Sequence, residues 1–314
     1  MPSRALTELR TRLTEVAWGR ARIAERLLVA VLAEGHVLIE DVPGVGKSSL
    51  VTRLAQALGV SFQRIQCTPD LLPSDVTGYT YYEPQAQTFT FRPGPVLTNL
   101  LLVDEINRTS PKTQASLLEA MEERQVTVDG VRHELPWPFT VLATENPIEF
   151  EGTFPLPEAQ LDRFLLRLRL GYPESQAELA VLQTEGFRQK APELTPLISL
   201  SDLRDAVEAA QAVPVGEPVA QYALAAVQGT RSHEALSLGV SPRGAIAWVR
   251  AARALAYLRD ERYVAPDHLR ELADEVLAHR VVVRADGTLR GVTGTTVVQE
   301  VLARTPLPQS APRR

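Results

Sequence analysis

The stretch that decides the fold runs from Asp41 to Ser48 and reads Asp-Val-Pro-Gly-Val-Gly-Lys-Ser. A short apolar run, His36–Glu40, comes before it, and a helical pattern follows up to Leu58, where Gly59 ends it. A loop of small residues between a strand and a helix lets successive backbone N–H groups surround phosphate oxygens, and the helix N-terminus adds its dipole. This order of elements predicts a phosphate-binding loop rather than an ordinary surface turn.

The end of this loop carries the side chains that nucleotide binding needs. Lys47 reaches the terminal phosphates, and the hydroxyl of Ser48 can hold Mg²⁺. Asp41 stands where the strict pattern has its first glycine, but Asp tolerates unusual backbone angles better than most residues, so we expect the loop to form. The predicted cofactors are ATP and Mg²⁺, and the predicted binding residues are Asp41, Pro43, Gly44, Val45, Gly46, Lys47, Ser48 and Ser49.

Polar side chains follow two further apolar strands. Leu100–Val103 is followed by Asp104 and Glu105, and two acids at the end of a buried strand are costly unless they meet a cation or a water molecule. We predict that Asp104 holds Mg²⁺ through water and that Glu105 activates the attacking water. Asn146, which follows the strand Phe139–Ala143, could position the same water, although an Asn-Pro pair can also simply start a turn.

The pattern of the chain changes near residues 171–173. Before this point strands alternate with helices, and two hairpins interrupt them, one in an insertion at 68–98 and one at 125–135 around Asp129-Gly130. We predict an α/β domain with a parallel sheet over 1–172, a helical domain over 173–304 and a flexible tail over 305–314. Helical patterns dominate the second domain, at 174–190, 201–212, 217–230, 242–260 and 266–279.

Composition limits the environment and the partners of the chain. A net charge of −5 over 314 residues disfavours wholesale binding of nucleic acid or anionic membranes. A single cysteine, Cys67, allows no disulfide within the chain and is expected to be a small buried residue. The early apolar run Leu27–Ala33 is too short to span a bilayer, and the N-terminus does not resemble a signal peptide. We expect a cytoplasmic protein with no nucleic acid partner and no direct membrane insertion.

With these motifs in order, the chain resembles the MoxR-type AAA+ ATPases over nearly its whole length. The resemblance implies a P-loop AAA+ domain with a helix-2 insert and a β-hairpin before sensor 1, followed by a small all-helical lid. Asn146 then corresponds to the sensor-1 residue, Arg163 to the arginine finger that reaches a neighbour's ATP, and Arg243 to the sensor-2 arginine, acting in its own subunit or in a neighbour's. The most specific stretches are 35–48, 104–108, 111–114, 118–130 and Gly152–Phe164, which ends in Leu-Asp-Arg-Phe.

The resemblance also implies what the protein assembles with and acts on. It implies a hexameric ring that remodels client proteins, assisting their maturation or the insertion of a metal or cofactor, with a partner that carries a von Willebrand factor A domain. Nothing in the chain specifies the client. Two alternatives stay open, the ATPase subunit of a metal chelatase and a helicase-like nucleic-acid motor. A third, a scaffold that binds ATP without hydrolysing it, would have no need of Glu105.

A few positions depart from the family pattern or allow a simpler interpretation. Asp41 and Glu145 are tolerable substitutions, whereas Trp18-Gly-Arg20 replaces the usual Val-Gly-Gln turn and leaves the adenine contacts open. Arg163 could instead cap a helix at the surface, and Arg243 could be a solvated residue at the start of a helix. For Arg132 and His133, a solvated hairpin and a contact with the client are equally open.

Overall fold

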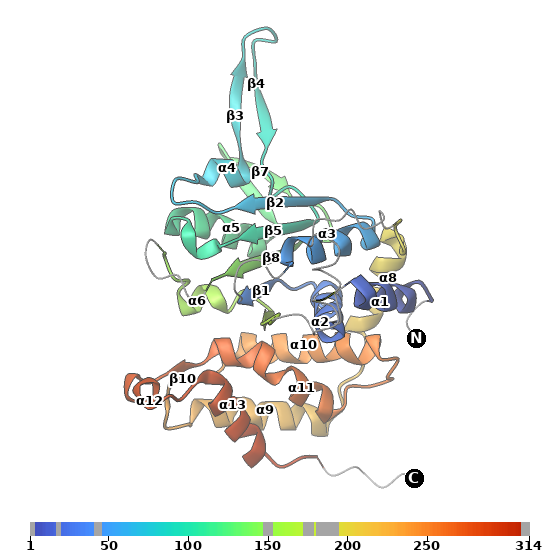
Figure 1. Cartoon of the computed structure of the whole chain (residues 1–314), viewed down its shortest axis with the longest axis vertical. Coiled ribbons are helices and arrows are strands. Elements are labelled where there is room, and N and C mark those ends of the chain that lie inside the picture. The colour runs from blue at the N-terminus through green and yellow to red at the C-terminus, as the bar shows by residue number, and fades with distance from the viewer. Residues whose placement is uncertain are drawn as a thin grey trace.

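The chain folds into an α/β part and a helical part, one stacked on the other (Figure 1). This computed structural model describes residues 4–16, 20–40, 46–146, 153–171, 179 and 195–308. Several predicted features lie outside the described residues: Asp41, Pro43, Gly44 and Val45 of the phosphate loop, Trp18 and Gly19, and all but one residue of the helix predicted at 174–190.

A parallel sheet of five strands forms the centre of the α/β part and confirms the predicted fold class. Each neighbouring pair of strands runs parallel. The two strands that come from unbroken apolar runs are buried throughout, as expected for strands covered on both faces. The order is β2 (Phe62–Gln66), β5 (Leu100–Asp104), β8 (Thr140–Glu145), β1 (Val37–Glu40) and β9 (Leu166–Leu168).

Helices cover both faces of the sheet, because successive side chains of a strand point to opposite sides. Leu100 and Leu102 of β5 belong to a core shared with α1 (Arg4–Val16), α2 (Ala21–Leu32) and α3 (Lys47–Leu58). Leu101 and Val103 belong to a second core built with α5 (Pro111–Glu123). The first core continues into the helical part, so one set of hydrophobic contacts joins the two parts.

The ends of α3 and α5 follow helix-capping rules. α3 begins after Gly46 and ends at Gly59, both in the left-handed region with φ of 86° and 65°, which confirms the predicted stop. Ser110 caps α5, because its side chain accepts a hydrogen bond from the backbone N–H of Thr113. Shorter helical turns complete the α/β part, namely α4 (Pro73–Thr77), η1 (Ile106–Arg108) and α6 (Glu158–Leu161).

Both predicted hairpins are present, and they touch each other. The larger pairs β3 (Gly78–Glu83) with β4 (Thr88–Pro93) and projects from the α/β part (Figure 1). The smaller pairs β6 (Gln125–Val128) with β7 (Val131–Glu134) across Asp129-Gly130, where both residues have the positive φ that a type I′ turn requires. The rings of Phe91 and His133 stack with 3.8 Å between their centroids, so the two hairpins are in contact.

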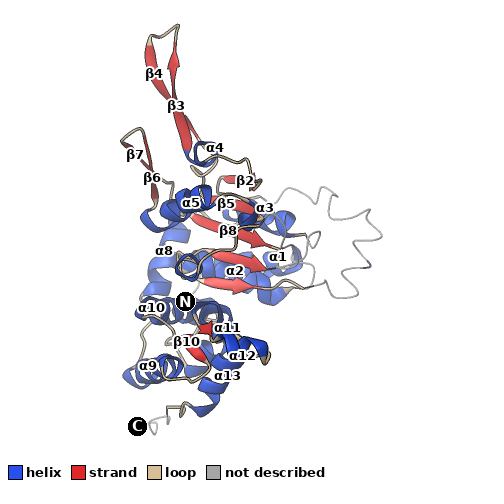
Figure 2. Cartoon of the chain, turned by 90° about the vertical axis from the view of Figure 1, so that its left-hand side faces the viewer, coloured by secondary structure: helices blue, strands red, loops and turns tan. Residues whose placement is uncertain are grey.

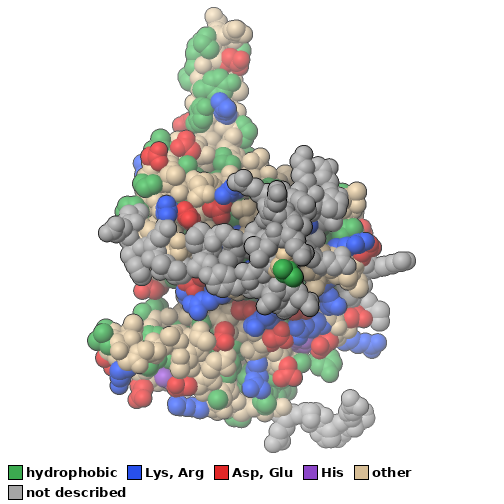
Figure 3. Space-filling view, in the orientation of Figure 1, with side chains coloured by type: hydrophobic (Ala, Val, Ile, Leu, Met, Phe, Trp, Pro, Cys, Tyr) green, Lys and Arg blue, Asp and Glu red, His purple; other side chains and the backbone are tan. Residues whose placement is uncertain are grey.

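The larger hairpin exposes aromatic side chains. Phe89 is 76% exposed, and Tyr79, Tyr81 and Tyr82 are exposed on the same hairpin. Figure 3 shows the hydrophobic side chains gathered on this projection. An apolar patch of this kind on a projecting element is typical of a surface that contacts another molecule.

The four predicted helices that lie within the described range of the helical part are confirmed. They are α8 (Leu200–Gln211), α9 (Glu217–Arg231), α10 (Pro242–Leu258) and α11 (Pro266–Leu277). The expectation of an all-helical second domain needs a correction, because β10 (Leu236–Leu238) pairs antiparallel with β11 (Val282–Val283). Strands of two or three residues are too short to show an alternating pattern in the sequence.

The last elements of the helical part were not predicted from the sequence. They are the 3-10 turn η2 (Ala278–Arg280), α12 (Ala285–Leu289) and α13 (Gly294–Arg304). α13 opens with Thr-Thr-Val-Val, and β-branched side chains lower helix propensity. The burial of Val297, Val298 and Val301 against the core outweighs this preference.

Cys67 fits the expectation from composition. It is buried, and burial raises the pKa of its thiol to about 12, so the thiol stays protonated and unreactive. Within the part of the chain that the structure describes, no helix has the length and the apolar character needed to cross a membrane.

Candidate active site

The predicted site residues of the α/β part lie at one edge of the sheet. β1, β5 and β8 are adjacent and parallel, so their carboxyl ends meet there, and α3 starts from the same edge, where the chain leaves β1 (Figure 2). Glu40 at the end of β1 is in register with Glu145 of β8, and Val103 of β5 with Ala143 of β8. Ligands of open parallel sheets bind outside the carboxyl ends of the strands. We call this the carboxyl edge.

The start of α3 presents the described end of the phosphate loop. Lys47 is the first residue of α3, Ser48 and Ser49 follow it, and all three side chains are half-buried. The left-handed Gly46 turns the chain into this helix. The backbone N–H groups and the dipole at the N-terminus of a helix favour an anion at this point.

Asp104 is held in place by neighbouring strands on both sides. Its carboxylate accepts a hydrogen bond from Nε of Arg64 on β2 at 2.6 Å and from Oγ1 of Thr144 on β8 at 3.3 Å. The side chain is only 8% exposed, and the guanidinium of Arg64 provides the opposite charge that a buried carboxylate needs. The carboxylate therefore has a fixed position at the end of β5.

Glu105 has an unusual backbone conformation. Its φ of 58° lies in the left-handed region, which a residue with a Cβ rarely adopts, and strain of this kind costs about 1–3 kcal/mol and gathers at functional sites. Its carboxylate contacts Nε of Arg108 at 3.0 Å and Nε2 of Gln66 at 3.2 Å. Its backbone N–H donates to Oγ1 of Thr144. These contacts hold the Glu105 carboxylate beside the end of β2 and beside Arg108.

Asn146 lies directly after β8, between the acids of β5 and the end of β1. It is buried, with 5% of its surface exposed. The neighbouring Glu145 has its pKa raised by burial and by the negative charge of Glu40. Glu40 itself is paired with Arg167 on β9 and with Arg169 just after it, which compensates its charge. Asn146 thus supplies an uncharged hydrogen-bonding group where the surrounding carboxylates are already fixed.

The residues present fit a magnesium ion. Mg²⁺ prefers oxygen donors and takes few of them from the protein, because it also binds water and phosphate oxygens. The hydroxyl of Ser48 and the carboxylate of Asp104 are such donors. Among the described residues, no cluster of three or more His, Cys, Asp or Glu side chains could form a metal cage by itself.

Arg163 and Arg243 meet at a different place. Nη2 of Arg163, which follows α6, lies 3.0 Å from Oε2 of Glu122 on α5, and Nη1 of Arg243, near the start of α10, lies 2.9 Å from Oε1 of the same side chain. Arg163 also donates to the backbone carbonyl of Leu118. The structure therefore brings the two predicted arginines together on one carboxylate.

Comparison with known proteins agrees with this geometry. Residues 36–166 match the model of the ATPase family associated with various cellular activities (AAA), and residues 228–301 match the AAA lid domain. The chain is 40% identical to the Chaperone MoxR1 of Mycobacterium tuberculosis, over 93% of this chain and 79% of that one. The chain belongs to the MoxR family of AAA+ ATPases. Residues 195–304, the helical part without its tail, are therefore called the lid below.

Two further relatives extend the MoxR comparison over the whole chain. The uncharacterized protein YeaC of Bacillus subtilis is 48% identical over 96% of this chain and 95% of its own length. The crystal structure of an ATPase candidate from Cytophaga hutchinsonii superposes with a TM-score of 0.90 at 33% identity, covering 97% of this chain and 95% of the other. This MoxR protein thus shares its fold with that structure over 97% of its chain.

A buried ion pair of this MoxR protein ties the lid to the segment of Arg163. Arg280 of η2 is 2% exposed, and its Nε donates to Oδ1 of Asp162 at 2.8 Å. Burial lowers the pKa of Arg280 to about 10, against the opposing effect of Asp162. Arg280 and His279 also hydrogen-bond to the backbone carbonyl of Phe164. Sequence analysis missed these contacts, because Arg280 and Asp162 are 118 positions apart.

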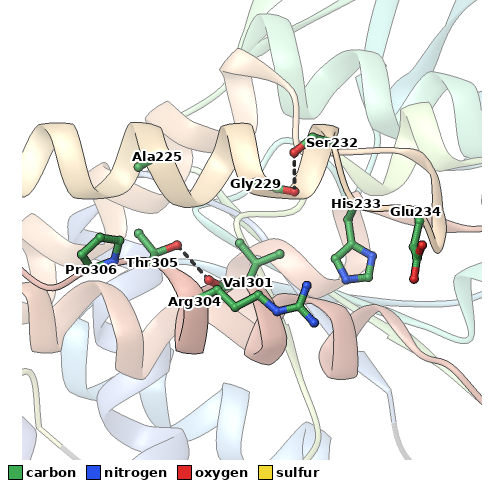
Figure 4. Close-up of a pocket in the computed structure, with 9 residues that line it drawn as sticks. All are labelled: Ala225, Gly229, Ser232, His233, Glu234, Val301, Arg304, Thr305 and Pro306. Carbon is green, nitrogen blue, oxygen red and sulfur yellow. Dashed lines mark hydrogen bonds between the residues drawn. The ribbon is translucent and has the colours of Figure 1, made fainter.

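A hollow in the lid of this MoxR protein lies between α9 and α13 (Figure 4). Its volume is about 540 Å³, and it is lined by His233, whose Nε2 lies 3.3 Å from Oε2 of Glu300. None of the residues that line it belongs to the predicted site. The candidate site of this MoxR protein is therefore at the carboxyl edge and at the arginine pair.

Proposed function

We propose that this MoxR protein hydrolyses ATP in a ring whose sites are each completed by Arg163 and Arg243 of the neighbouring subunit. The observation that supports this is the separation of the two sets of residues within one subunit. Lys47, Asp104 and Asn146 lie at the carboxyl edge of the sheet, whereas both arginines lie at the other end of the strands.

The contacts of α5 place the arginines at that opposite end, the amino edge. His36, just before β1, contacts the backbone carbonyl of Met121 through Nε2 at 3.0 Å. Arg124 donates to the backbone carbonyl of Phe139, just before β8. Glu122 lies between Met121 and Arg124, so it lies beside the starts of the strands. β8 has six residues, so the two edges are roughly 20 Å apart at about 3.3 Å per residue.

This distance favours action between subunits for Arg243 as well as for Arg163. Neither guanidinium can span the sheet to its own nucleotide, but both are half-buried or exposed on the outside of the subunit. A neighbour that places its carboxyl edge against this surface would bring its terminal phosphate to both arginines. Of the two alternatives for Arg243, we therefore propose action at a neighbour's site.

The residues then divide the chemistry of phosphoryl transfer. Lys47 binds the terminal phosphates, Glu105 accepts a proton from the attacking water, and Asn146 orients that water. Ser48 and Asp104 would hold Mg²⁺, which would neutralise charge on the phosphates. The guanidinium groups of Arg163 and Arg243 stabilise the charge that develops on the transferred group.

The biological role follows from the family. We propose a hexameric, cytoplasmic assembly that remodels client proteins and assists their maturation or the insertion of a metal or cofactor, together with a partner carrying a von Willebrand factor A domain. The relative named Chaperone MoxR1 supports a chaperone-like role. The exposed aromatic side chains of the β3–β4 hairpin provide a surface for clients. We keep 1–172 and 173–304 as the proposed domains and 305–314 as the tail.

A mixing experiment tests the shared site. Arg163→Ala should bind ATP normally but hydrolyse it at least about 10³-fold more slowly, since an arginine finger contributes about 10³–10⁵ in rate. Mixing it with the equally inactive Lys47→Ala should restore activity, because an intact site can then face an intact arginine. Arg290→Ala, which removes an exposed arginine of the lid, is the matched control. Mixed rings that form without regaining activity would contradict the proposal.

A further inference from the structure

We infer that Glu122 is a positioning residue, which holds Arg163 and Arg243 as one pair for the phosphate of a neighbouring subunit. This inference rests on the proposed function, because it assumes that both arginines act on a neighbour's nucleotide. It adds a third residue to that site and explains how two arginines from different parts of the chain come to act together.

The geometry shows one carboxylate between two guanidinium groups. Oε2 of Glu122 lies 3.0 Å from Nη2 of Arg163, and Oε1 lies 2.9 Å from Nη1 of Arg243. Each arginine therefore pairs with its own carboxylate oxygen. Two positive groups this close would repel each other without the negative charge between them. Glu122 therefore determines how near the two guanidinium groups stay.

Arg163 and Arg243 depend on Glu122 to different extents. Arg163 has a second anchor in the backbone carbonyl of Leu118, and its side chain is 28% exposed. Arg243 is 54% exposed and reaches α5 from α10, which belongs to the lid. Removing the carboxylate should therefore release Arg243 more than Arg163, and it would loosen the contact between lid and α5 at this point.

The exposure of Glu122 favours a role in positioning rather than in stability. Its side chain is 39% exposed, and ion pairs in such surroundings contribute little to folding. Such weak pairs can exchange, so the guanidinium groups can turn from the carboxylate to a phosphate. A hollow of about 290 Å³ lies beside Arg163 and Glu122, with room for this movement.

The helix that carries Glu122 offers a matched control. Glu119 lies one turn earlier on α5, is exposed, and borders the same hollow. Glu119→Gln removes the same charge from the same helix without removing the carboxylate between the arginines. If only the negative charge of this surface matters, both variants should lose turnover. If the carboxylate positions the arginines, only Glu122→Gln should lose turnover.

Steady-state hydrolysis by the assembled protein tests the inference. Glu122→Gln should lower kcat about 10-fold, leave KM for ATP within about twofold and keep the wild-type unfolding midpoint, since misplacing a reacting group by about 1 Å can cost up to 10²-fold. Glu122→Asp should recover part of the loss, and Glu119→Gln should match the wild type. Wild-type turnover in Glu122→Gln would overturn the inference, and so would faster turnover, which would show that the carboxylate competes with phosphate.

Mixed rings separate this inference from the proposed function. Glu122→Gln mixed with Lys47→Ala should regain activity, because the first keeps its nucleotide site and the second keeps its arginine pair. Glu122→Gln mixed with Arg163→Ala should gain nothing, because both lack a working pair. If Arg163→Ala is rescued by Lys47→Ala but Glu122→Gln is not, Glu122 does not act between subunits and only this inference fails. If neither is rescued in rings that do form, the shared site itself is wrong.

Discussion

The carboxyl edge and the arginine pair are built in opposite ways. At the carboxyl edge, Asp104, Glu105 and Asn146 extend from adjacent strands of one buried sheet, which fixes them relative to one another. At the amino edge, Arg163 and Arg243 come from a loop after α6 and from the lid, and an exposed carboxylate joins them. In the proposed function, the carboxyl edge supplies its half of the site from one subunit, whereas the other half depends on how two parts of the chain, and then two subunits, pack.

The largest effects should come from the carboxyl edge itself. Lys47→Ala should abolish nucleotide binding, because the phosphates lose their main positive charge. Glu105→Gln should retain ATP and lose about 10²–10⁴-fold in turnover, since it removes only the group that activates water. Calorimetry with a non-hydrolysable ATP analogue distinguishes the two. A comparable loss of binding in both variants would contradict the role assigned to Glu105.

Asn146 tests whether the buried sheet also positions the water. Asn146→Ala should reduce turnover about 10²-fold and leave ATP affinity nearly unchanged, because a positioning group acts on the reaction and not on the bound phosphates. Single-turnover hydrolysis beside equilibrium binding measures both quantities. Glu145→Gln, at the preceding position, is the control and should behave like the wild type. Unchanged turnover in Asn146→Ala would show that Asn146 starts a turn and does not position the water.

The buried pair of Asp162 and Arg280 tests how firmly the lid is fixed to the segment of Arg163. Asp162→Asn leaves the guanidinium of Arg280, which is 2% exposed, without its charge partner. It should lower the free energy of unfolding by about 2 kcal/mol. The loss should be smaller than for a fully buried pair, because Asp162 is 23% exposed. Asp286→Asn breaks an exposed pair with Arg290 and should cost no more than about 0.5 kcal/mol. Urea unfolding of the two variants gives the comparison, and equal effects would contradict it.

Between pH 7.5 and 5.5, His36 gives the smallest of these effects, a dependence of stability on pH that amounts to about 1.4 kcal/mol over the range. Burial lowers its pKa to about 3, and Nδ1 accepts a hydrogen bond from the backbone N–H of Val141 at 3.0 Å. Between pH 6.5 and 3 the unfolded chain binds a proton there that the native protein does not, so stability falls as pH falls, by up to about 1.4 kcal/mol per unit. Above pH 6.5 this contribution is complete and constant.

Urea unfolding between pH 7.5 and 5.5 measures the dependence on His36. His36→Gln keeps a side chain that can donate and accept but cannot take up this proton, so its stability should fall less steeply over the same range. His279, also fully buried with its pKa lowered by burial and by Arg280, should still contribute a slope at the lid. Identical slopes for the wild type and His36→Gln would show that the ring of His36 is protonated in the native state.

The sequence could predict the carboxyl edge because its signals are local. An unbroken apolar run predicted β5, and Asp129-Gly130 predicted the turn of the smaller hairpin. Asp104 and Glu105 come at the end of the same apolar run, so their place at the edge of the sheet followed from it. Even there, Arg64 was missed, because its bond to Asp104 crosses from one strand to another that is 40 positions away. An alternating strand beside β5 was the available signal, since Arg64 and Gln66 lie on one of its faces.

The amino edge could be predicted only in part. The resemblance named Arg163 and Arg243, but nothing in the sequence placed them together, since Glu122 and Arg243 are 121 positions apart. Whether Arg243 acts in its own subunit depends on where α5 ends relative to the sheet, which is a matter of packing. β10 and β11 were missed for a related reason, because two or three residues carry no periodic pattern and their pairing is decided by the lid around them.

One feature of α5 connects the arginine pair to the projecting hairpins. The helix that carries Glu122 ends at Glu123, and after Arg124 the chain enters β6, with the backbone N–H of Leu135 bonded to the carbonyl of Arg124. His133 of this hairpin stacks on Phe91 of the larger one. A backbone hydrogen bond and a ring stack thus link α5 to both hairpins. A small tilt of α5 when a neighbour's phosphate draws the arginines away would become a wider sweep of the aromatic tip.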